Sequence, residues 1–392
     1  MDANLKILLV HCSYRFYGGE DKVFFQERDA LRSQLGADSV FEYHVSNSHA
    51  TSWKILFHIL FPFYHSFRIR RLIRQNGITL VHVHNFFPLL TFSVFKSAKR
   101  AGAVVVHTLH NYRWWCAGAE LYRKDYGVCE LCVHTGHSLH AIRYGCYRNS
   151  RWQSMFAVLI LSLARKRTMF HYIDYFIVLS SFQQYWVTSQ GIPSHKVILK
   201  PNWVEYCEPV SVEHRRGFVF VGRLEPSKGV ESLLKCWVDN AISVPLILIG
   251  SGSLEQMLRE KYKLYPNIHF MGACSQQETL TLIGRSKYLI HPSLWYETFG
   301  LTLVEAMQQG VPVIGYAIGT RLELIEDGVN GFLCQPNTLA QTIEKALSFS
   351  GYDQLSANAI KSAHQFTRES LALKQVQFYR TWVQRKYSPI HQ

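Results

Sequence analysis

The chain has 392 residues, of which 48% are hydrophobic and 14% aromatic, a composition that excludes a disordered protein and predicts well-filled cores. One core rarely serves a chain of this length, so we expect two domains of roughly 150–200 residues each. The formal net charge is +14, and no run approaches the roughly 18 consecutive apolar residues that a membrane-spanning helix needs.

The positive charge lies almost wholly in the first half of the chain. Residues 1–205 hold 24 Lys and Arg against 12 Asp and Glu, whereas residues 206–392 hold 18 against 16. A basic half indicates an anionic partner: a phosphate-bearing lipid, a membrane surface or a nucleic acid. Charge alone does not choose among these partners.

The first ten residues, MDANLKILLV, contain the acidic Asp2 and lack a basic segment followed by a long apolar one. We therefore expect no secretory signal and a cytoplasmic location. In the cytoplasm the nine cysteines are expected to be thiols or metal ligands rather than disulfides.

The first predicted elements are a strand over residues 5–13, a turn that contains Gly18 and Gly19, and a helix over 22–35. Open α/β sheets bind ligands at such turns, at the carboxyl ends of their strands. The two glycines therefore fit a ligand loop, and they fit a tight turn with no other role equally well. Further strands are predicted, mostly separated by helical segments, over residues 78–85, 103–111, 175–181 and 196–202.

Two segments of this half, residues 52–74 and 156–170, combine bulky apolar side chains with clustered basic ones. Each segment can lie on an anionic leaflet, with its aromatic face down and its cations at the headgroups. Each can instead be an ordinary helix that packs its apolar face on the sheet. Pro62 would kink or end a single helix in the first segment.

His110 is placed at the carboxyl end of the predicted strand 103–111. A histidine at such a position can donate a hydrogen bond to a ligand or shuttle a proton. Its position at the end of a strand is the reason for choosing His110 as a candidate site residue among the 19 histidines of the chain. His107 is expected inside the strand, and we interpret it as structural.

Four cysteines, Cys116, Cys129, Cys132 and Cys146, fall within 31 residues of a half that is otherwise poor in cysteine. A Cys-x-x-Cys pair flanked by two further cysteines has the spacing of a four-thiolate structural zinc site. Free thiols and a redox pair are the alternatives. Such a zinc would staple a loop rather than take part in chemistry.

The second half repeats the alternation of strands and helices, with strands predicted over residues 217–225, 244–252, 267–273, 288–293 and 310–316. Two such series predict two doubly wound α/β domains. We place them at 1–205, with a Cys-rich insertion at about 112–150, and at 206–375. The last segment, 369–387, is predicted to be a helix, and the C-terminal helical part, which we bound at 376–392, can pack back on the first domain.

Two loops of the second half carry residues suited to phosphate. Arg223 and Lys228, in GRLEPSKG, are close enough on one loop to hold a diphosphate, although they could also be solvated surface cations. The small residues Gly250, Ser251 and Gly252 end a strand, where backbone N–H groups suit phosphate or base. Packing would explain these glycines equally well.

The stretch HPSLWYETFGLTLVEAMQQG holds two glutamates, one on a loop and one in a helix that Gly310 ends. Glu297 follows a strand, and Glu305 lies about a turn and a half into the helix. The N–H groups at the helix start, near Phe299–Thr302, form an anion site between them. Taken alone, Glu305 could also be an exposed helix residue.

The motifs GRLEPSKG, LIGSGSL, HPSLWYETFGLTLVEAMQQGVPVIG and GTRLELIEDGVNGFL together resemble the nucleotide-sugar-binding half of the family-four glycosyltransferases, over roughly residues 200–350. These enzymes have the GT-B architecture: two facing Rossmann-like, doubly wound domains with an interdomain cleft. The resemblance implies that Glu297 contacts the transferred sugar. It also implies two binding sets: Arg223, Lys228, Phe299, Gly300 and Leu301 for the donor diphosphate, and Glu305, Gly250, Ser251 and Gly252 for the ribose and base. Ser251 stands where such loops often carry an acidic residue.

In the first half, Gly18 and Gly19 match a family loop near the donor phosphate, and His110 matches the family's active-site histidine. The run HNYR…C…CxxC…CYR is similar to an insertion in many capsule and O-antigen transferases. The resemblance implies transfer from a UDP- or GDP-type nucleotide sugar to a saccharide hydroxyl, with retention of configuration. It further implies a lipid-diphosphate-linked acceptor, bacterial surface polysaccharide assembly and a place on the inner face of the cytoplasmic membrane. No cofactor is expected for catalysis, and no Asp-x-Asp occurs in the sequence.

Other classes of function remain as alternatives. A non-catalytic nucleotide-sugar binder and a sugar-nucleotide epimerase of the same architecture would share these motifs. A nucleic-acid partner is suggested only by the positive charge, and neither a nucleic-acid-binding motif nor a basic tail accompanies it. We therefore expect no nucleic-acid partner.

Overall fold

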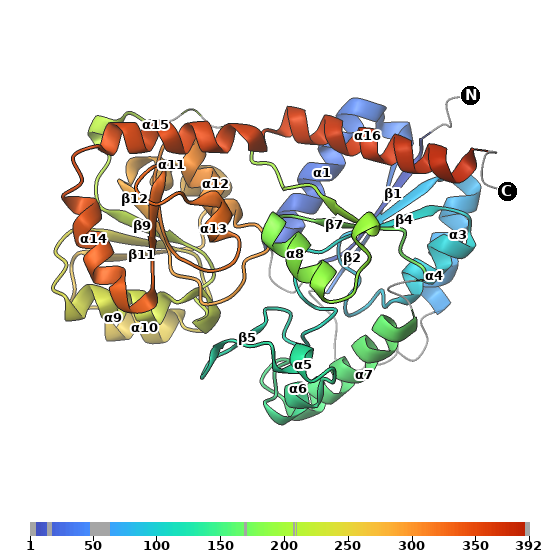
Figure 1. Ribbon diagram of the computed structural model, residues 1–392, viewed down its shortest axis with the longest axis horizontal. Helices are drawn as coiled ribbons and strands as arrows, with labels where there is room; N and C mark the ends of the chain where they lie inside the picture. The colour runs from blue at the N-terminus through green and yellow to red at the C-terminus, as the bar shows by residue number, and fades with distance from the viewer. Residues whose placement is uncertain are drawn as a thin grey trace. The chain divides into compact units, whose positions relative to one another are not determined.

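The computed structural model describes residues 5–13, 18–47, 63–167, 171–206, 208 and 210–388, and it divides into two compact units (Figure 1). Unit 1 comprises residues 1–119, 131–202 and 368–392, and unit 2 comprises residues 120–130 and 203–367. The division at 202/203 lies close to the predicted 205/206. Residues 120–130 of the Cys-rich insertion group with unit 2, and residues 368–375 group with unit 1, which differs from the predicted bounds.

Unit 1 is built on a parallel sheet of six strands in the order β2-β1-β3-β4-β7-β8. Its central strands are mostly apolar, with one histidine in each of β1, β3 and β4, and they are buried on both faces, as parallel sheets require. β1 is central, because Ile7 pairs with Val40 on one side and with Leu80 on the other. The strands are β1 (Ile7–Ser13), β2 (Val40–Ser46), β3 (Leu80–Val83), β4 (Val104–Thr108), β7 (Tyr175–Val178) and β8 (Val197–Leu199).

Helices cover both faces of this sheet. Right-handed connections that run in opposite directions along the sheet put α1 and α4 on opposite faces. α16 packs beside α1, and α3 packs beside α4 (Figure 1). The helices are α1 (Gly19–Leu35), α3 (Phe63–Asn76), α4 (Ser93–Arg100), α5 (Leu131–His134), α6 (Leu139–Arg143), α7 (Arg151–Arg167), α8 (Ser181–Ser189) and α16 (Arg368–Tyr387).

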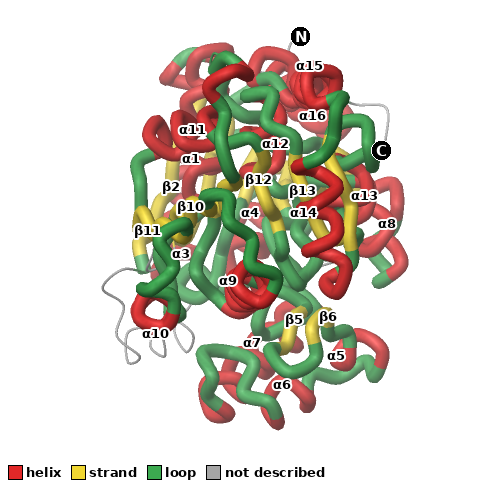
Figure 2. Tube along the Cα trace, turned by 90° about the vertical axis from the view of Figure 1, so that its left-hand side faces the viewer, coloured by secondary structure: helices red, strands yellow, loops and turns green. Residues whose placement is uncertain are grey.

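Unit 2 has a second parallel sheet of six strands, in the order β11-β10-β9-β12-β13-β14. Its strands run between layers of helices, which Figure 2 shows in red around the yellow strands. The sheet strands are β9 (Phe218–Val221), β10 (Leu246–Ile249), β11 (Ile268–Gly272), β12 (Tyr288–His291), β13 (Val313–Tyr316) and β14 (Gly331–Cys334). A small hairpin, β5 (Tyr122–Arg123) and β6 (Gly127–Val128), also belongs to this unit.

The helices of unit 2 bury large aliphatic and aromatic side chains against the sheet. Trp237 from α9 stacks edge-on against Phe218 of β9, and both side chains are fully buried. The helices are α9 (Val230–Asp239), α10 (Glu255–Lys261), α11 (Gln276–Arg285), α12 (Leu301–Gln308), α13 (Arg321–Leu324), α14 (Leu339–Leu347) and α15 (Tyr352–Ala363).

The predicted fold class, two doubly wound α/β domains, is confirmed. Each predicted strand is present and is shorter than predicted. The sequence analysis missed the edge strands β2 and β14 and the hairpin β5–β6. The helix predicted over 369–387 is present as α16, which begins at Arg368, and the whole helix belongs to unit 1 rather than only its part beyond 375.

In the part of the chain that the structure describes, no helix has the length and apolar character needed to cross a bilayer. The first basic-apolar segment is described only from Phe63, in α3, so residues 52–62 with Pro62 lie outside the described residues. The second lies in α7 up to Arg167, and residues 168–170 lie outside the described residues.

Candidate functional site

The carboxyl ends of β9 and β12 meet at the centre of unit 2, where the strand order reverses and open α/β sheets bind their ligands. Lys228 follows β9 and Glu297 follows β12. The Lys228 Nζ atom lies 2.7 Å from Glu297 Oε1, and the two side chains are 16% and 9% exposed. Ser293 donates a second hydrogen bond to the same oxygen at 2.9 Å. The structure thus brings two of the predicted residues together in one ion pair.

Glu297 is ionised although it is buried. Burial alone would raise the pKa of its carboxyl group, but Lys228, His291 and Arg321 together lower that pKa to about 2. Burial lowers the pKa of His291 to about 3, so this histidine is neutral at pH 7. Burial also lowers the pKa of Arg321 to about 10, which leaves its guanidinium charged.

Arg321 fixes the loop that carries Glu297. Its guanidinium donates to the carbonyl oxygens of Tyr316 at 2.7 Å and Ser293 at 2.8 Å. The Thr320 hydroxyl donates to the Glu297 carbonyl at 2.7 Å. Both residues lie within the motif GTRLELIEDGVNGFL, to which the sequence-based prediction gave no individual roles. Their place after the carboxyl end of β13 was the signal that could have marked them as site residues.

Glycines let the loops of the site approach one another closely. Gly229 has a φ of +71°, and a Cβ there would lie 2.0 Å from the Pro292 carbonyl oxygen. Gly250, with a φ of +130°, makes an equally close approach to the Gly222 carbonyl. A Cβ on Gly252 would lie 2.5 Å from the Leu224 carbonyl. The Ser251 carbonyl accepts from the Leu224 N–H at 2.9 Å. Packing therefore accounts for this loop, and its predicted contact with ribose and base stays a prediction.

The start of α12 provides backbone N–H groups after Gly300, whose φ is +89°. Leu301 is the first helical residue, whereas the Phe299 ring is buried against Phe366. A contact from Phe299 to an anion would therefore have to come from its backbone. Glu305 is buried in α12, so the alternative of an exposed helix residue is wrong.

Arg223 pairs with a carboxylate that the sequence analysis did not consider. Its Nη2 atom lies 2.7 Å from Oε1 of Glu120, which precedes the hairpin β5–β6. The Arg223 side chain is 55% exposed, so the pair is accessible to solvent. Both predicted diphosphate cations, Arg223 and Lys228, are therefore held by carboxylates of the same unit.

In unit 1, the end of β4 brings His110 next to a second histidine. His110 Nε2 lies 2.9 Å from His84 Nδ1, and the two rings stack 5.1 Å apart. Both residues line a small cavity together with Asn85, Asn111 and Trp114. Burial lowers the pKa of His84 to about 3 and holds the pKa of His110 well below its usual value, so both are neutral at pH 7.

His107 lies inside β4, where Nδ1 is 2.8 Å from the Val83 carbonyl oxygen. Burial lowers its pKa to about 3. This arrangement agrees with the interpretation of His107 as a structural residue.

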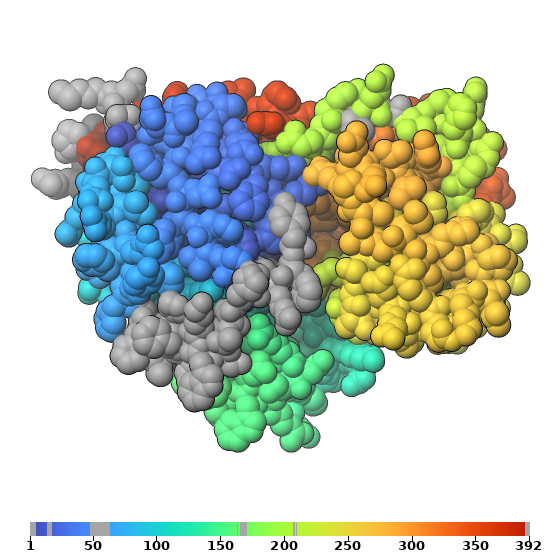
Figure 3. All heavy atoms as spheres, turned by 180° about the vertical axis from the view of Figure 1, so that it is seen from behind, coloured from blue at the N-terminus to red at the C-terminus, as the bar shows by residue number. Residues whose placement is uncertain are grey.

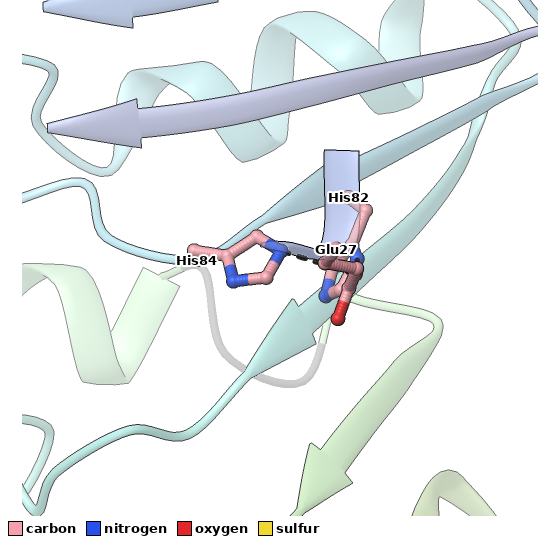
Figure 4. A group of neighbouring side chains, drawn as sticks. All are labelled: Glu27, His82 and His84. Atoms are coloured by element: carbon pink, nitrogen blue, oxygen red, sulfur yellow. Dashed lines mark hydrogen bonds and ion pairs between the residues drawn. The ribbon is translucent and has the colours of Figure 1, made fainter. Parts of the chain in front are cut away.

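Beneath the His84–His110 pair lies a buried polar cluster that the sequence analysis missed. Glu27 of α1 lies against His82 and His84 of β3 and its carboxyl end (Figure 4). Their ligand atoms lie within 4.8 Å of one another, so these three residues could hold a metal ion. Their sequence separation, from α1 to β3, gave no local motif to find.

Gly18 and Gly19 stand at the start of α1. The Gly18 N–H donates to Asp21 Oδ2 at 3.0 Å, and the other Asp21 oxygen lies 2.9 Å from His11 Nε2. This arrangement caps α1. The loop before it, residues 14–17, lies outside the described residues.

The four cysteines predicted to hold zinc are all half-buried. Cys132 lies in α5, and Cys129 follows β6. Cys116 and Cys146 flank Gly118, where a Cβ would lie 3.7 Å from Cys116 Sγ and 3.1 Å from the Cys146 carbonyl oxygen. Gly118 therefore leaves the space that the approach of these two cysteines requires.

Comparison with known proteins assigns the chain to a family. The family model described as Glycosyltransferase Family 4 matches residues 23–206, and the model described as Glycosyl transferases group 1 matches residues 208–366. The chain belongs to glycosyltransferase family 4 and has the GT-B fold.

The chain is also similar to individual proteins, over part or all of its length. A GDP-mannose-dependent alpha-mannosyltransferase from Corynebacterium glutamicum is 32% identical over 164 residues, which cover 41% of this chain and 38% of that protein. The O-antigen chain mannosyltransferase B of Escherichia coli is 25% identical over 190 residues, 44% of this chain and 49% of its own. These matches thus span less than half the length of either relative. The Anabaena protein HepE, solved in complex with UDP-glucose, is similar in fold, with a TM-score of 0.66 and 18% identity over 96% of this chain and 100% of its own.

Proposed function

We propose that the chain transfers a sugar from a nucleotide-diphosphate sugar to a hydroxyl of a saccharide acceptor, with retention of configuration. The observation that carries the proposal is the buried ion pair between Lys228 and Glu297 at the switch point of unit 2. A cation and an ionised carboxylate held there suit the two ends of such a donor, a diphosphate and a sugar rich in hydroxyls. The relatives that act on GDP-mannose and bind UDP-glucose support this donor class.

In this proposal, negative charge that develops on the leaving diphosphate is stabilised by Lys228, by Arg223 and by the N–H groups at the start of α12. Glu297 accepts hydrogen bonds from the transferred sugar, and Glu305 from the ribose. A bound diphosphate would compete with Glu120 for Arg223 and would share Lys228 with Glu297, because an ammonium group has three N–H donors. His110, from unit 1, contacts the sugar during transfer, and no metal ion is required at the diphosphate.

The proposed acceptor is a lipid-diphosphate-linked saccharide in bacterial surface polysaccharide assembly, at the inner face of the cytoplasmic membrane. The O-antigen mannosyltransferase among the relatives supports this class of acceptor. The excess of basic residues in 1–205 supports an anionic acceptor or surface.

The donor proposal is tested with a panel of UDP- and GDP-sugars, scored first by the rise in Tm and then by transfer of labelled sugar to lipid-linked acceptors. We expect one donor to raise the Tm in the wild type and in Glu297→Ala, but to be turned over only by the wild type. Donor turnover without an acceptor would identify an epimerase. Stabilisation with no turnover of any kind would identify a non-catalytic binder, and no stabilisation by any donor would overturn the proposal.

We propose that unit 1 also docks on an anionic bilayer through aromatic side chains of α3 and α7. Trp152, Phe156 and Leu159 follow a helical spacing on α7 and are exposed, Trp152 to 72%. The bright green surface at the bottom of Figure 3 belongs to the segment that contains α6 and α7. On α3, Phe63 and Phe67 are also exposed. Exposed basic residues accompany both helices: Arg68, Arg71, Arg74, Arg143, Arg148 and Arg151.

Vesicle sedimentation tests this docking. The wild type should bind phosphatidylglycerol vesicles and release at high salt, and Trp152→Ser with Phe156→Ser should weaken binding at least about tenfold. Tyr185→Ser, which removes an equally exposed aromatic side chain from α8, is the matched control and should bind like the wild type. Equal binding by both variants, or no binding by the wild type, would refute the docking surface.

We also propose that Cys116, Cys129, Cys132 and Cys146 bind a structural zinc ion. Tetrathiolate zinc would tie the insertion together without entering the chemistry. Metal analysis of the purified chain should find about one zinc per chain, and Cys132→Ser should lose it. A zinc-free wild type that keeps its Tm in chelator would exclude the site.

A further inference from the structure

The buried cluster of unit 1 forms a linear chain of contacts from a carboxylate to His110. Glu27 Oε1 lies 3.2 Å from His84 Nε2, and His84 Nδ1 lies 2.9 Å from His110 Nε2. All three side chains are buried, and they come from α1, the end of β3 and the end of β4. Such a chain transmits the protonation state of one end to the other, because each neutral imidazole has one donor and one acceptor nitrogen.

The carboxylate end of the chain is charged. The Lys200 ammonium lies 3.0 Å from Glu27 Oε2 and is itself buried. Burial would raise the pKa of Glu27, but Lys200, His84 and His82 hold it well below its usual value. An ionised carboxylate only accepts hydrogen bonds, so the hydrogen between Glu27 and His84 must belong to His84 Nε2.

The protonation of both histidines then follows. Because His84 is neutral and carries its hydrogen on Nε2, its Nδ1 atom is an acceptor. The contact between His84 Nδ1 and His110 Nε2 therefore needs a hydrogen on His110 Nε2. His110 is neutral as well, so its Nδ1 atom carries a lone pair and no hydrogen.

The negative charge of Glu27 in this cluster is neutralised by Lys200, so the cluster needs no metal ion. Glu27, His82 and His84 could converge on a metal, but Lys200 already contacts one carboxylate oxygen. Gln375 and Tyr379 of α16 contact the other, Tyr379 at 3.4 Å. A divalent ion would have to share this buried space with an ammonium group, which is electrostatically unfavourable. We therefore interpret the cluster as a hydrogen-bond network.

We propose that Glu27 is a positioning residue which, through His84, fixes the ring orientation of His110 and its Nε2-protonated tautomer. This inference rests on the proposed function, because it concerns how His110 acts in transfer. The sequence analysis allowed His110 to donate a hydrogen bond or to shuttle a proton. The network excludes donation from Nδ1: this nitrogen carries a lone pair, so toward a hydroxyl group it acts as a hydrogen-bond acceptor and as the atom that can take up a proton.

The direct test uses ¹⁵N NMR of the histidine-labelled full-length protein at pH 7, with the His110 signals assigned from their loss in His110→Gln. We expect the Nε2 of His110 to be protonated and its Nδ1 unprotonated. In Glu27→Gln the His110 signals should shift toward a mixture of tautomers. A wild type with a protonated Nδ1, or with an imidazolium, would overturn the inference. This measurement needs no substrate, so it stands apart from any failure of the proposed function.

Kinetics provide the second readout. Glu27→Gln should lower kcat about 10- to 100-fold, as loss of an orienting partner does. The KM for the donor should stay within about twofold, because the contacts of Arg223 and Lys228 with the diphosphate are assigned to unit 2 and are left intact. His65→Gln is the matched control, a buried histidine of unit 1 that contacts the Tyr43 hydroxyl at 2.8 Å instead. Its kcat should stay near the wild-type value. Equal losses in both variants would indicate a general packing effect and contradict the positioning role. Should Glu27→Gln not fold, the wild-type NMR spectrum alone decides.

Discussion

The two units have similar sheets but sites of opposite character. In unit 2 the candidate site is charged: the ammonium of Lys228 and the carboxylate of Glu297 meet at 2.7 Å on loops next to each other. In unit 1 the groups at the strand ends are neutral histidines, backed by a carboxylate from α1. The same fold can thus hold a charged group directly on its loops, as in unit 2, or bury the charge one layer below the site, as in unit 1. The first arrangement suits an anionic ligand, and the second sets the state of a neutral group.

The strand orders of the two sheets also differ, and this difference places the two sites. Unit 2 has the Rossmann order, with its switch point between β9 and β12, where Lys228 and Glu297 lie. In unit 1, β2 lies beside β1 at one edge, so the switch point falls between β1 and β3. His84, which follows β3, therefore lies at the corresponding position of unit 1.

The largest effect is expected from Lys228→Met, which breaks the charged site. Activity should fall at least about 1,000-fold, because a cation that meets developing charge is lost. Glu297 would then be a buried carboxylate without its main partner, at a cost of about 3 kcal/mol in the free energy of unfolding. Denaturant unfolding and initial rates measure the two effects. Lys235→Met, at an exposed pair with Asp239 on α9, is the control and should change neither. Full activity in Lys228→Met would contradict the account of unit 2.

The next largest effect is expected from acid, which should destabilise unit 1 more than unit 2. Buried neutral histidines have folded pKa values below their unfolded values, so their stability is complete above pH 6.5 and is lost as pH falls toward about 3. Each such histidine removes about 1 kcal/mol of stability between pH 6.5 and 5.5. Among the described histidines that are buried and have a lowered pKa, His84, His107 and His110 lie in unit 1 and His291 in unit 2.

Hydrogen exchange followed by mass spectrometry at pH 7 and pH 5.5 measures this difference. Amides in β1, β3 and β4 should lose more protection on acidification than amides in β9, β12 and β13. Equal loss in both sheets, or greater loss in unit 2, would show that the neutral histidine cluster does not govern the acid response.

A smaller effect is expected from the backbone of the charged site. Gly229→Ala must place a Cβ 2.0 Å from a carbonyl oxygen, whereas Gly77→Ala in unit 1 has open space at a similar φ of +63°. Both variants carry the strain of a positive φ, so Gly229→Ala should cost about 2 kcal/mol more than Gly77→Ala. Chemical unfolding compares the two. Equal costs would mean that the loops of unit 2 can separate freely.

The smallest effect is expected from Glu120→Gln, which frees Arg223 from an exposed ion pair. Affinity for a nucleoside diphosphate should rise two- to fivefold, in keeping with the modest worth of such pairs. Asp125→Asn removes a nearby exposed charge between β5 and β6 and is the matched control. Weaker binding in Glu120→Gln would mean that Glu120 helps to hold the ligand rather than competing with it.

The sequence predicted the central strands and the ion-pair residues because both are local signals. Strands such as β1 and β9 are continuous apolar runs, and Lys228 and Glu297 lie in motifs with fixed spacing. β2 was missed because Glu42 and His44 interrupt its apolar residues, and β14 because it is a short strand that directly follows a loop at Gly331. Glu27 and Lys200 were missed for another reason: a buried pair so far apart in sequence has no periodicity to reveal it.

The proposed donor site requires above all that the Arg223–Lys228 loop of unit 2 binds a diphosphate. Calorimetric titration with UDP and UMP, and with GDP and GMP, tests it on the wild type and on the double variant Arg223→Met, Lys228→Met. For one base, the diphosphate should bind the wild type at least about tenfold more tightly than the monophosphate, and the double variant should lose that advantage. A diphosphate advantage that persists in the variant, or is missing from the wild type, would contradict the claim.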